Sequence, residues 1–120
     1  MRSTILVVED DAAVRRVLTL LLELDGHRVL AAHDVPSALA LAQSHRGVID
    51  LLVTDIVLPG GGASALLEGL DALGRSLPVL YLSGSPRPES GGLPERPSLF
   101  LAKPFVPDRL SDAVHELLGR

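Results

Sequence analysis

Acidic side chains at the ends of two apolar runs are the residues of this sequence best suited to chemistry. Glu9, Asp10 and Asp11 directly follow the run ILVV, and Asp55 closes the run LLVT. If both runs are parallel strands, these acids lie at the carboxyl edge of the sheet, where open α/β sheets bind ligands. Carboxylates gathered there repel one another unless a cation lies among them, and an all-oxygen site suits Mg²⁺ better than zinc or copper.

A simpler explanation is that such acids cap the helices that follow their strands, which is a common use of aspartate. We expect this role for Asp11. Capping does not explain why Glu9, the last residue of the first predicted strand, is also acidic. It also does not explain why another strand ends in an acid, Asp55. The cation site therefore remains the preferred interpretation of the acids.

Two further strand ends carry polar side chains. Ser83 closes the run VLYL, and Lys103 follows the run LFLA directly before a proline. Alone, a serine there is more often a turn residue, and a lysine is more often a solvated charge. Together with the acids they suit a phosphoryl group: a cation and Lys103 offset its charge, the hydroxyl donates a hydrogen bond, and Asp55 acts as nucleophile.

The elements that position these residues alternate along the chain. Short apolar runs predict five strands, at 4–9, 27–32, 51–55, 78–83 and 98–102. Apolar residues at intervals of three and four predict helices at 11–24, from 36 to 42, at 64–73 and at 106–118. Strands that alternate with helices indicate a parallel sheet covered on both faces. The predicted fold class is a five-stranded α/β domain.

A proline- and glycine-rich stretch interrupts this alternation between the fourth and fifth strands. Residues 86–97 contain four prolines, each of which costs about 3 kcal/mol inside a helix. We expect a mobile loop there in place of a helix, with at most one helical turn. The stretch is not a domain linker, because the 22 residues from 99 onward form only one strand and one helix. Residues 1–120 are therefore predicted to be a single domain.

Composition narrows the class of protein further. The net charge of −4, without a basic stripe, argues against nucleic-acid contact. With no apolar span of membrane length and no signal peptide, we expect no membrane insertion and a soluble, cytoplasmic domain. The four histidines, at 27, 33, 45 and 115, are scattered, so we expect surface or boundary positions and no histidine metal site.

Four motifs together carry a family resemblance over essentially the whole chain. ILVVEDDAAVRRVL, LLVTDIVLPG, VLYLSG and FLAKPF, in this order, resemble the receiver domain of two-component response regulators. The resemblance implies a flavodoxin-like (CheY-like), doubly wound sheet of order 2-1-3-4-5. It also implies that Asp55 is the phosphoacceptor, with Mg²⁺ held by Glu9, Asp10, Asp55 and the backbone carbonyl of Val57.

The same resemblance assigns switch residues and partners. Ser83 is then the hydroxyl switch, Phe100 the aromatic switch, and Lys103 the conserved-type lysine of a cis Lys-Pro peptide. The phosphoryl donor would be a phosphohistidine on a sensor histidine kinase or a histidine phosphotransfer domain. The domain would catalyse only its own phosphorylation and dephosphorylation. The sequence of these motifs is similar to that of receivers in hybrid sensor kinases, so the chain would be a cytoplasmic portion of such a kinase. A stand-alone regulator has almost the same sequence pattern.

The sequence departs from the family pattern at its output face. The fourth helix is degenerate or replaced by residues 86–97, and Phe100 lacks a hydroxyl to anchor either rotamer. Two alternatives therefore stay open. A degenerate receiver would act as an interaction module without phosphorylation, although the full set of site residues is present. An unrelated α/β hydrolase could use Asp55 as nucleophile, but Val57 stands where a second acid is expected, and no lid is evident.

Overall fold

A five-stranded sheet with helices on both faces makes up the computed structural model, which describes residues 2–84 and 96–119. The strands are β1 (Thr4–Val8), β2 (Arg28–Ala32), β3 (Leu51–Asp55), β4 (Val79–Ser83) and β5 (Ser98–Ala102). The helices are α1 (Ala12–Leu24), α2 (Val35–Ser44), α3 (Gly62–Ala72) and α4 (Pro107–Leu118). Each agrees with the predicted element to within two residues at its start.

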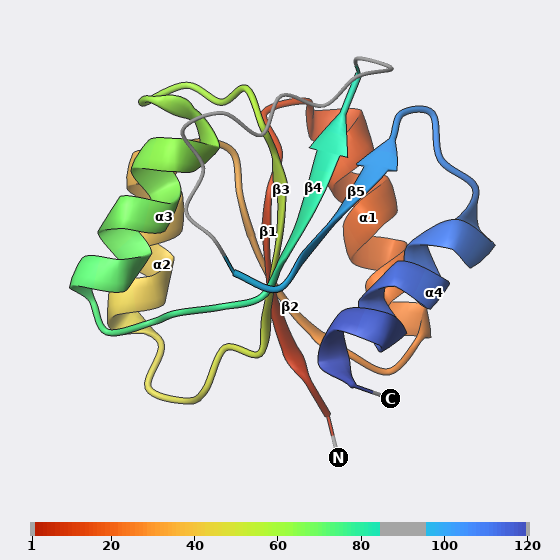
Figure 1. Cartoon of the computed structure of the whole chain (residues 1–120), viewed down its shortest axis with the longest axis horizontal. Coiled ribbons are helices and arrows are strands. Elements are labelled where there is room, and N and C mark those ends of the chain that lie inside the picture. Colours follow the sequence, from red (N-terminus) through yellow and green to blue (C-terminus); the bar gives the residue numbers. More distant parts are fainter. Residues whose placement is uncertain (1, 85–95, 120) are drawn as a thin grey trace.

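All neighbouring strands are parallel, and their order is β2-β1-β3-β4-β5. β1 therefore lies between β2 and β3. The chain forms β2 on one side of β1, crosses to the other side to form β3, and continues outward through β4 and β5. The predicted sheet order is thereby confirmed. Figure 1 shows the sheet nearly edge-on, with the carboxyl ends of the strands at the top.

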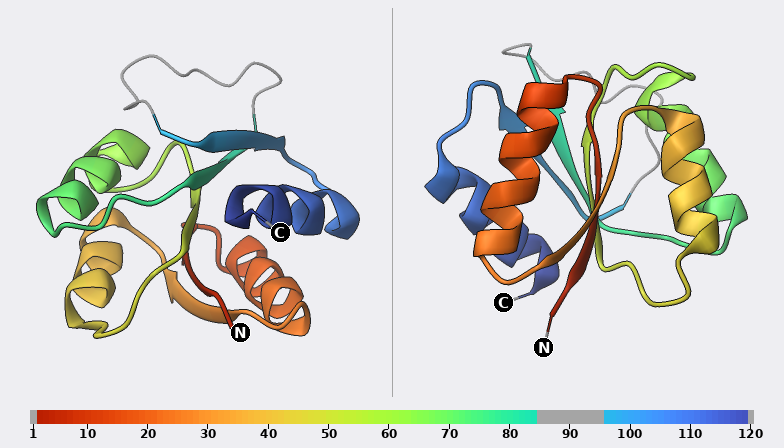
Figure 2. Two further views of the ribbon diagram at one scale, coloured as in Figure 1. Left: turned by 60° about the horizontal axis from the view of Figure 1, so that its bottom comes forward. Right: turned by 180° about the vertical axis from the view of Figure 1, so that it is seen from behind.

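Alternate side chains of the buried strands enter two hydrophobic cores. Figure 1 shows α2 and α3 on one face of the sheet and α1 and α4 on the other, and both views of Figure 2 agree. In the α2–α3 core, Leu6, Leu52 and Tyr81 pack beneath the helices. In the α1–α4 core, Ile5 and Val53 do so on the opposite face. The sheet is therefore the middle layer between two layers of helices.

Local sequence fixes where the helices begin. Asp11 caps α1, because its Oδ1 accepts hydrogen bonds from the amides of Ala13 and Val14, at 2.9 and 3.1 Å. The predicted capping role of Asp11 is thus confirmed. At the start of α3, Gly61 has a φ of +115°, and a Cβ on it would lie 2.7 Å from that of Ala65. Only glycine adopts this turn without strain.

The predicted loop at 86–97 lies outside the described residues apart from its last two. Arg96 and Pro97 belong to neither a helix nor a strand. Arg96 donates to the carboxylate of Asp71 at 2.9 Å, which ties the start of β5 to the last turn of α3. Of the helices in the described ranges, none has the length and hydrophobicity needed to cross a membrane.

Candidate functional site

The carboxyl edge of the sheet brings three acids together. Glu9 and Asp10 follow β1, Asp55 ends β3, and these strands are neighbours in the sheet. Because Val8 of β1 pairs with Thr54 of β3, the two strands end side by side. One carboxylate oxygen from each acid lies within 4.8 Å of the others. The predicted convergence of Glu9, Asp10 and Asp55 is therefore present in the structure.

Lys103 reaches these acids from β5. Its Nζ donates hydrogen bonds to Oε2 of Glu9 at 2.8 Å and to Oδ2 of Asp55 at 2.9 Å. The side chain of Glu9 is only 1% exposed, while that of Asp55 is 16% exposed. A buried carboxylate needs a compensating partner, and Lys103 supplies one charge to two acids. The cluster thus keeps a negative excess.

Burial and pairing oppose each other in setting the pKa values here. Burial raises the pKa of Glu9, the nearby charge of Asp55 raises it further, and the hydrogen bond from Lys103 works against both; the net direction is upward. For Lys103, burial alone would lower the pKa, but the hydrogen bonds to Glu9 and Asp55 outweigh it and raise the pKa. Lys103 therefore stays cationic at neutral pH.

Backbone groups orient the acids. The amide of Ile56 donates to Oδ1 of Asp55 at 3.0 Å, and Oδ2 of Asp55 faces Lys103. Nη1 of Arg15 donates to the backbone carbonyl of Glu9 at 2.9 Å, which ties the end of β1 to the first turns of α1. The Asp11 carboxylate faces the amides of α1 instead, so it is engaged as a helix cap.

The other predicted residues border the cluster. Ser83 is buried and ends β4, and its carbonyl accepts from the Lys103 amide at 2.8 Å. Asp55 pairs with Leu82, so Ser83 lies one residue further toward the site. Val57 lies in the connection from β3 to α3 and is 80% exposed. The roles of Ser83 and Val57 stay predictions.

The expected aromatic switch residue lies on β5. The ring of Phe100 stacks on that of Tyr81 with centroids 5.0 Å apart and an interplanar angle of 25°. Phe100 is 38% exposed, whereas Tyr81 is buried, so the Phe100 ring is held by the stacking but is only partly enclosed. Three residues later, the Lys103–Pro104 peptide is cis, as the resemblance implies. The switching role of Phe100 stays a prediction.

An apolar hollow beside Lys103 was not predicted. Its volume is about 430 Å³, and its lining comes from α1 and from the segment after β5. The lining residues are Ala13, Val14, Val17, Lys103, Pro104 and Phe105. Val17 is 48% exposed on α1, which is unusual for a position in an apolar helical repeat. That exposure depends on which face of α1 meets the sheet, so spacing alone could not have identified it.

The expectation for the histidines is wrong in one respect. His27 is buried, with 5% of its surface exposed, and is not a surface or boundary residue. Its ring also lies near that of His115, with centroids 6.2 Å apart, although the two residues are far apart in sequence. Asp25 lies between them. Scattering along the sequence therefore did not predict separation in space.

Comparison with known proteins places the chain in a family. Residues 5–115 match the family described as Response regulator receiver domain. The chain is 42% identical over 89 residues, 71% of its length, to sensor histidine kinase AruS of Pseudomonas aeruginosa, covering 9% of that protein. It is 35% identical over its whole length to response regulator MprA of Mycobacterium ulcerans, covering 52% of that protein. The chain thus spans about half, or much less, of these curated relatives.

Solved structures show the same architecture. The receiver domain of the hybrid histidine kinase CckA matches with a TM-score of 0.80 and 35% identity, over 97% of this chain and 99% of that one. A response regulator receiver protein from Sinorhizobium medicae matches with a TM-score of 0.85 and 27% identity, over 98% and 95% of the two chains. A CheY-like receiver from Methanospirillum hungatei shares the fold with a TM-score of 0.82.

Proposed function

Because this chain belongs to the response regulator receiver domain family, a class of two-component signalling module, we propose that it accepts a phosphoryl group on Asp55. The observation that carries the proposal is the pair of hydrogen bonds from Lys103 to Glu9 and Asp55 at the carboxyl edge of the sheet. They place a nucleophilic carboxylate, a second acid and a fixed cation within contact of one another. Such a set suits phosphoryl transfer, in which positioning and charge stabilisation dominate.

The transfer needs little covalent chemistry from the protein. An oxygen of Asp55 supplies the electron pair for a new bond to phosphorus. The bond between phosphorus and the donor histidine breaks, and its electron pair stays on the imidazole nitrogen, which then takes up a proton. Lys103 Nζ, 2.9 Å from Oδ2 of Asp55, is placed to bind an oxygen of the incoming group, and the Ser83 hydroxyl would donate to another. Attack by water on the acyl phosphate later restores the carboxylate.

The residues present also fit Mg²⁺. Glu9, Asp10 and Asp55 offer only oxygen atoms, and one lysine does not balance their charge. We assign these three carboxylates and the backbone carbonyl of Val57 as the residues that would hold the ion. When bound, Mg²⁺ offsets charge on the phosphoryl oxygens. Lys103 would then exchange its contacts with the acids for contacts with the phosphoryl group.

The proposed donor is a phosphohistidine on a cytoplasmic sensor histidine kinase or histidine phosphotransfer domain. Two of the similar proteins, AruS and CckA, are histidine kinases by name, which supports a histidine donor. The apolar hollow beside Lys103 supports a docking place next to Asp55, since Val14, Val17 and Phe105 would cover an apolar helix face of the donor. Docking there would bring the donor's imidazole to the acids.

Phosphorylation is proposed to act on the surface through Ser83 and Phe100. The Ser83 hydroxyl would be drawn toward the phosphoryl group, and the Phe100 ring would change its packing on Tyr81. The partial exposure of Phe100 supports such a change, because the ring is not fully enclosed. The switch is a shift between two packings, so its size depends on how differently they bind the phosphoryl group.

A small phosphodonor such as acetyl phosphate, supplied with Mg²⁺, tests the proposed function without a kinase. A single label that is released by hydroxylamine and maps to Asp55 is the expected result. No label would identify the chain as an interaction module that works without phosphorylation. Turnover of varied phosphoesters would identify it instead as a hydrolase that uses Asp55 as nucleophile.

A further inference from the structure

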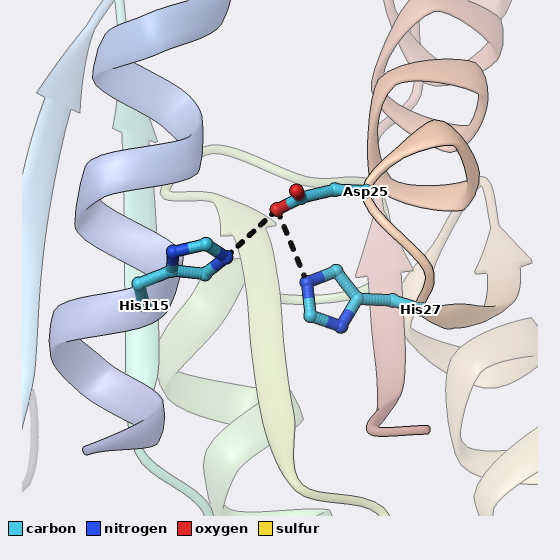
Figure 3. Close-up of side chains that lie close together, drawn as sticks. All are labelled: Asp25, His27 and His115. Carbon is cyan, nitrogen blue, oxygen red and sulfur yellow. Dashed lines mark hydrogen bonds and ion pairs between the residues drawn. The ribbon is translucent and has the colours of Figure 1, made fainter. Parts of the chain in front are cut away.

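Two histidines and an aspartate meet at the edge of the sheet away from Asp55. Asp25 is the C-cap of α1, His27 directly precedes β2, and His115 lies in the last turn of α4, as Figure 3 shows. These residues lie at the amino end of β2, whereas Asp55 ends the parallel strand β3. A strand of five residues is roughly 17 Å long. The cluster is therefore separate from the proposed phosphorylation site.

Both imidazoles point at one carboxylate oxygen. Nε2 of His115 lies 2.9 Å from Oδ2 of Asp25, and Nε2 of His27 lies 3.5 Å from the same atom. The Ser111 hydroxyl donates to that oxygen as well, at 3.2 Å, which steadies the carboxylate. One ligand atom from each of Asp25, His27 and His115 lies within 4.8 Å of the others. Figure 3 shows His115 on α4 facing Asp25 and His27, which lie on the segment between α1 and β2.

The spacing of these atoms suits a small metal ion. Zinc bonds of about 2.0–2.1 Å to nitrogen and oxygen place tetrahedral ligand atoms roughly 3.3–3.4 Å apart. The separations of 2.9 and 3.5 Å at Asp25 lie on either side of that value. Seating an ion therefore requires side-chain movements that bring the third pair of ligand atoms, which lies within 4.8 Å, to a similar separation.

The three side chains differ in solvent exposure in a way that also suits a metal site. The His27 side chain is 3% exposed, so packing fixes its orientation, while those of Asp25 and His115 are 32% and 44% exposed. The exposed side gives an ion a path from solvent and leaves room for a water ligand. Three protein ligands with one water is a common zinc arrangement.

We propose that Asp25, His27 and His115 form a Zn²⁺ site that joins the α1–β2 turn to α4. Imidazole nitrogen with carboxylate oxygen suits Zn²⁺, whereas the all-oxygen cluster around Asp55 suits Mg²⁺, so the two sites select different ions. Coordination uses the lone pair of each Nε2, so a bound ion replaces the contact between that nitrogen and Asp25. The ion then links residues that are 90 positions apart in sequence.

Calorimetric titration of the untagged full chain with Zn²⁺, in excess Mg²⁺, tests the site. The expected result is one Zn²⁺ per chain, with affinity reduced at least about tenfold by His115→Ala. The matched control is His33→Ala, because His33 also faces a carboxylate, that of Asp34 at 3.3 Å, but belongs to no such cluster among residues 2–84 and 96–119. Asp55→Asn should leave Zn²⁺ binding unchanged. Absence of binding, or an equal loss in His115→Ala and His33→Ala, would overturn the proposal.

A second measurement needs no variant of the cluster, which matters because the buried His27 contributes to packing. Imidazole ¹⁵N resonances of the wild-type chain are recorded as Zn²⁺ is added. Shifts at His27 and His115 at one equivalent, with those of His33 and His45 unchanged, are the expected result. Equal shifts at all four histidines, or none, would refute the site.

Discussion

Lys103 contacts both a buried acid and the proposed phosphoacceptor, and this double contact sets its dual role. In the resting state it compensates Glu9 and Asp55 through bonds of 2.8 and 2.9 Å. In the proposed phosphorylated state, one of these bonds would be available for the phosphoryl group. The residue is therefore expected to matter more for the phosphorylated conformation than for cation binding.

Substitution of Lys103 separates these two functions. In Lys103→Ala, Mg²⁺ affinity should be kept or rise, because a positive charge beside the carboxylates is lost. The change that phosphorylation causes in amide resonances around Ser83 and Phe100 should shrink at least severalfold. Lys103→Arg, which keeps the charge but changes the shape of the donor, is the matched control for charge. An equal loss of Mg²⁺ affinity and of the switch in Lys103→Ala would show that the residue is only structural.

Residue-level prediction succeeded where sheet geometry governs position. Glu9, Asp55 and Lys103 could be placed together because parallel strands end at one edge, whatever the packing of the helices. Asp25 and His115 could not, because they meet only where α4 packs beside α1. That neighbourhood depends on which face of the sheet each helix covers, and spacing in the sequence does not encode it.

At the scale of elements, helix ends were predicted best where a side chain caps them. Asp11 was identified as the cap of α1, and Asp34 plays the same role for α2 with a bond of 2.8 Å to the Ser37 amide. For α3 the predicted start at Ser64 is two residues late, since the helix begins at Gly62. A turn made by successive glycines carries no side-chain signal that marks the first helical residue.

Asp34 is expected to make the fold acid-sensitive. Hydrogen bonds from Ser37, and then the charge of His33, lower the pKa of Asp34 below its ordinary value of 3.8. Since the folded value is the lower one, the stabilisation is present above the unfolded pKa and is lost as pH falls through the folded value. Asparagine caps helices but does not titrate. Asp34→Asn should therefore lose less stability between neutral and acidic pH, as measured by urea midpoints; an unchanged pH profile would contradict this.

The exposed apolar face of α1 is expected to serve donor docking. Val17→Glu places a charge in the hollow beside Lys103, so transfer from a histidine donor should slow by at least about tenfold. Labelling by acetyl phosphate should stay at the wild-type level, because that donor needs no docking surface. Val48→Glu is the matched control, since Val48 is 73% exposed but lines a different hollow. Equal slowing in both variants, or slowing with both donors, would argue against docking there.

At the scale of the molecule, one sheet couples the two cores. The α2–α3 core and the α1–α4 core are built from alternate residues of the same strands, as β1 shows with Leu6 on one face and Ile5 on the other. We therefore expect that neither core loses its packing alone, and the single domain over residues 1–120 stays a prediction. The parallel sheet was predictable from the alternation of elements, and its strand order from the resemblance to receiver domains. Residues 86–95 lie outside the part described.

Truncation of a side chain in either core should therefore destabilise both cores together. Leu18 and Leu66, one in each core, are fully buried, so replacement of either by alanine should cost about 2–5 kcal/mol of unfolding free energy. Urea transitions followed by far-ultraviolet circular dichroism and by the fluorescence of Tyr81, the only tyrosine, should coincide in both variants. Two separate transitions, or a change in one probe alone, would mean that the cores unfold independently.

The proposed phosphoacceptor gives the most direct test of the account. Intact-mass measurement after acetyl phosphate and Mg²⁺ should show one added phosphoryl group in the wild type and in Asp11→Asn, whose carboxylate caps α1. Asp55→Asn should fold normally by circular dichroism and gain none. Labelling of Asp55→Asn at the wild-type yield would contradict the account, because the phosphoryl group would then reside on another residue.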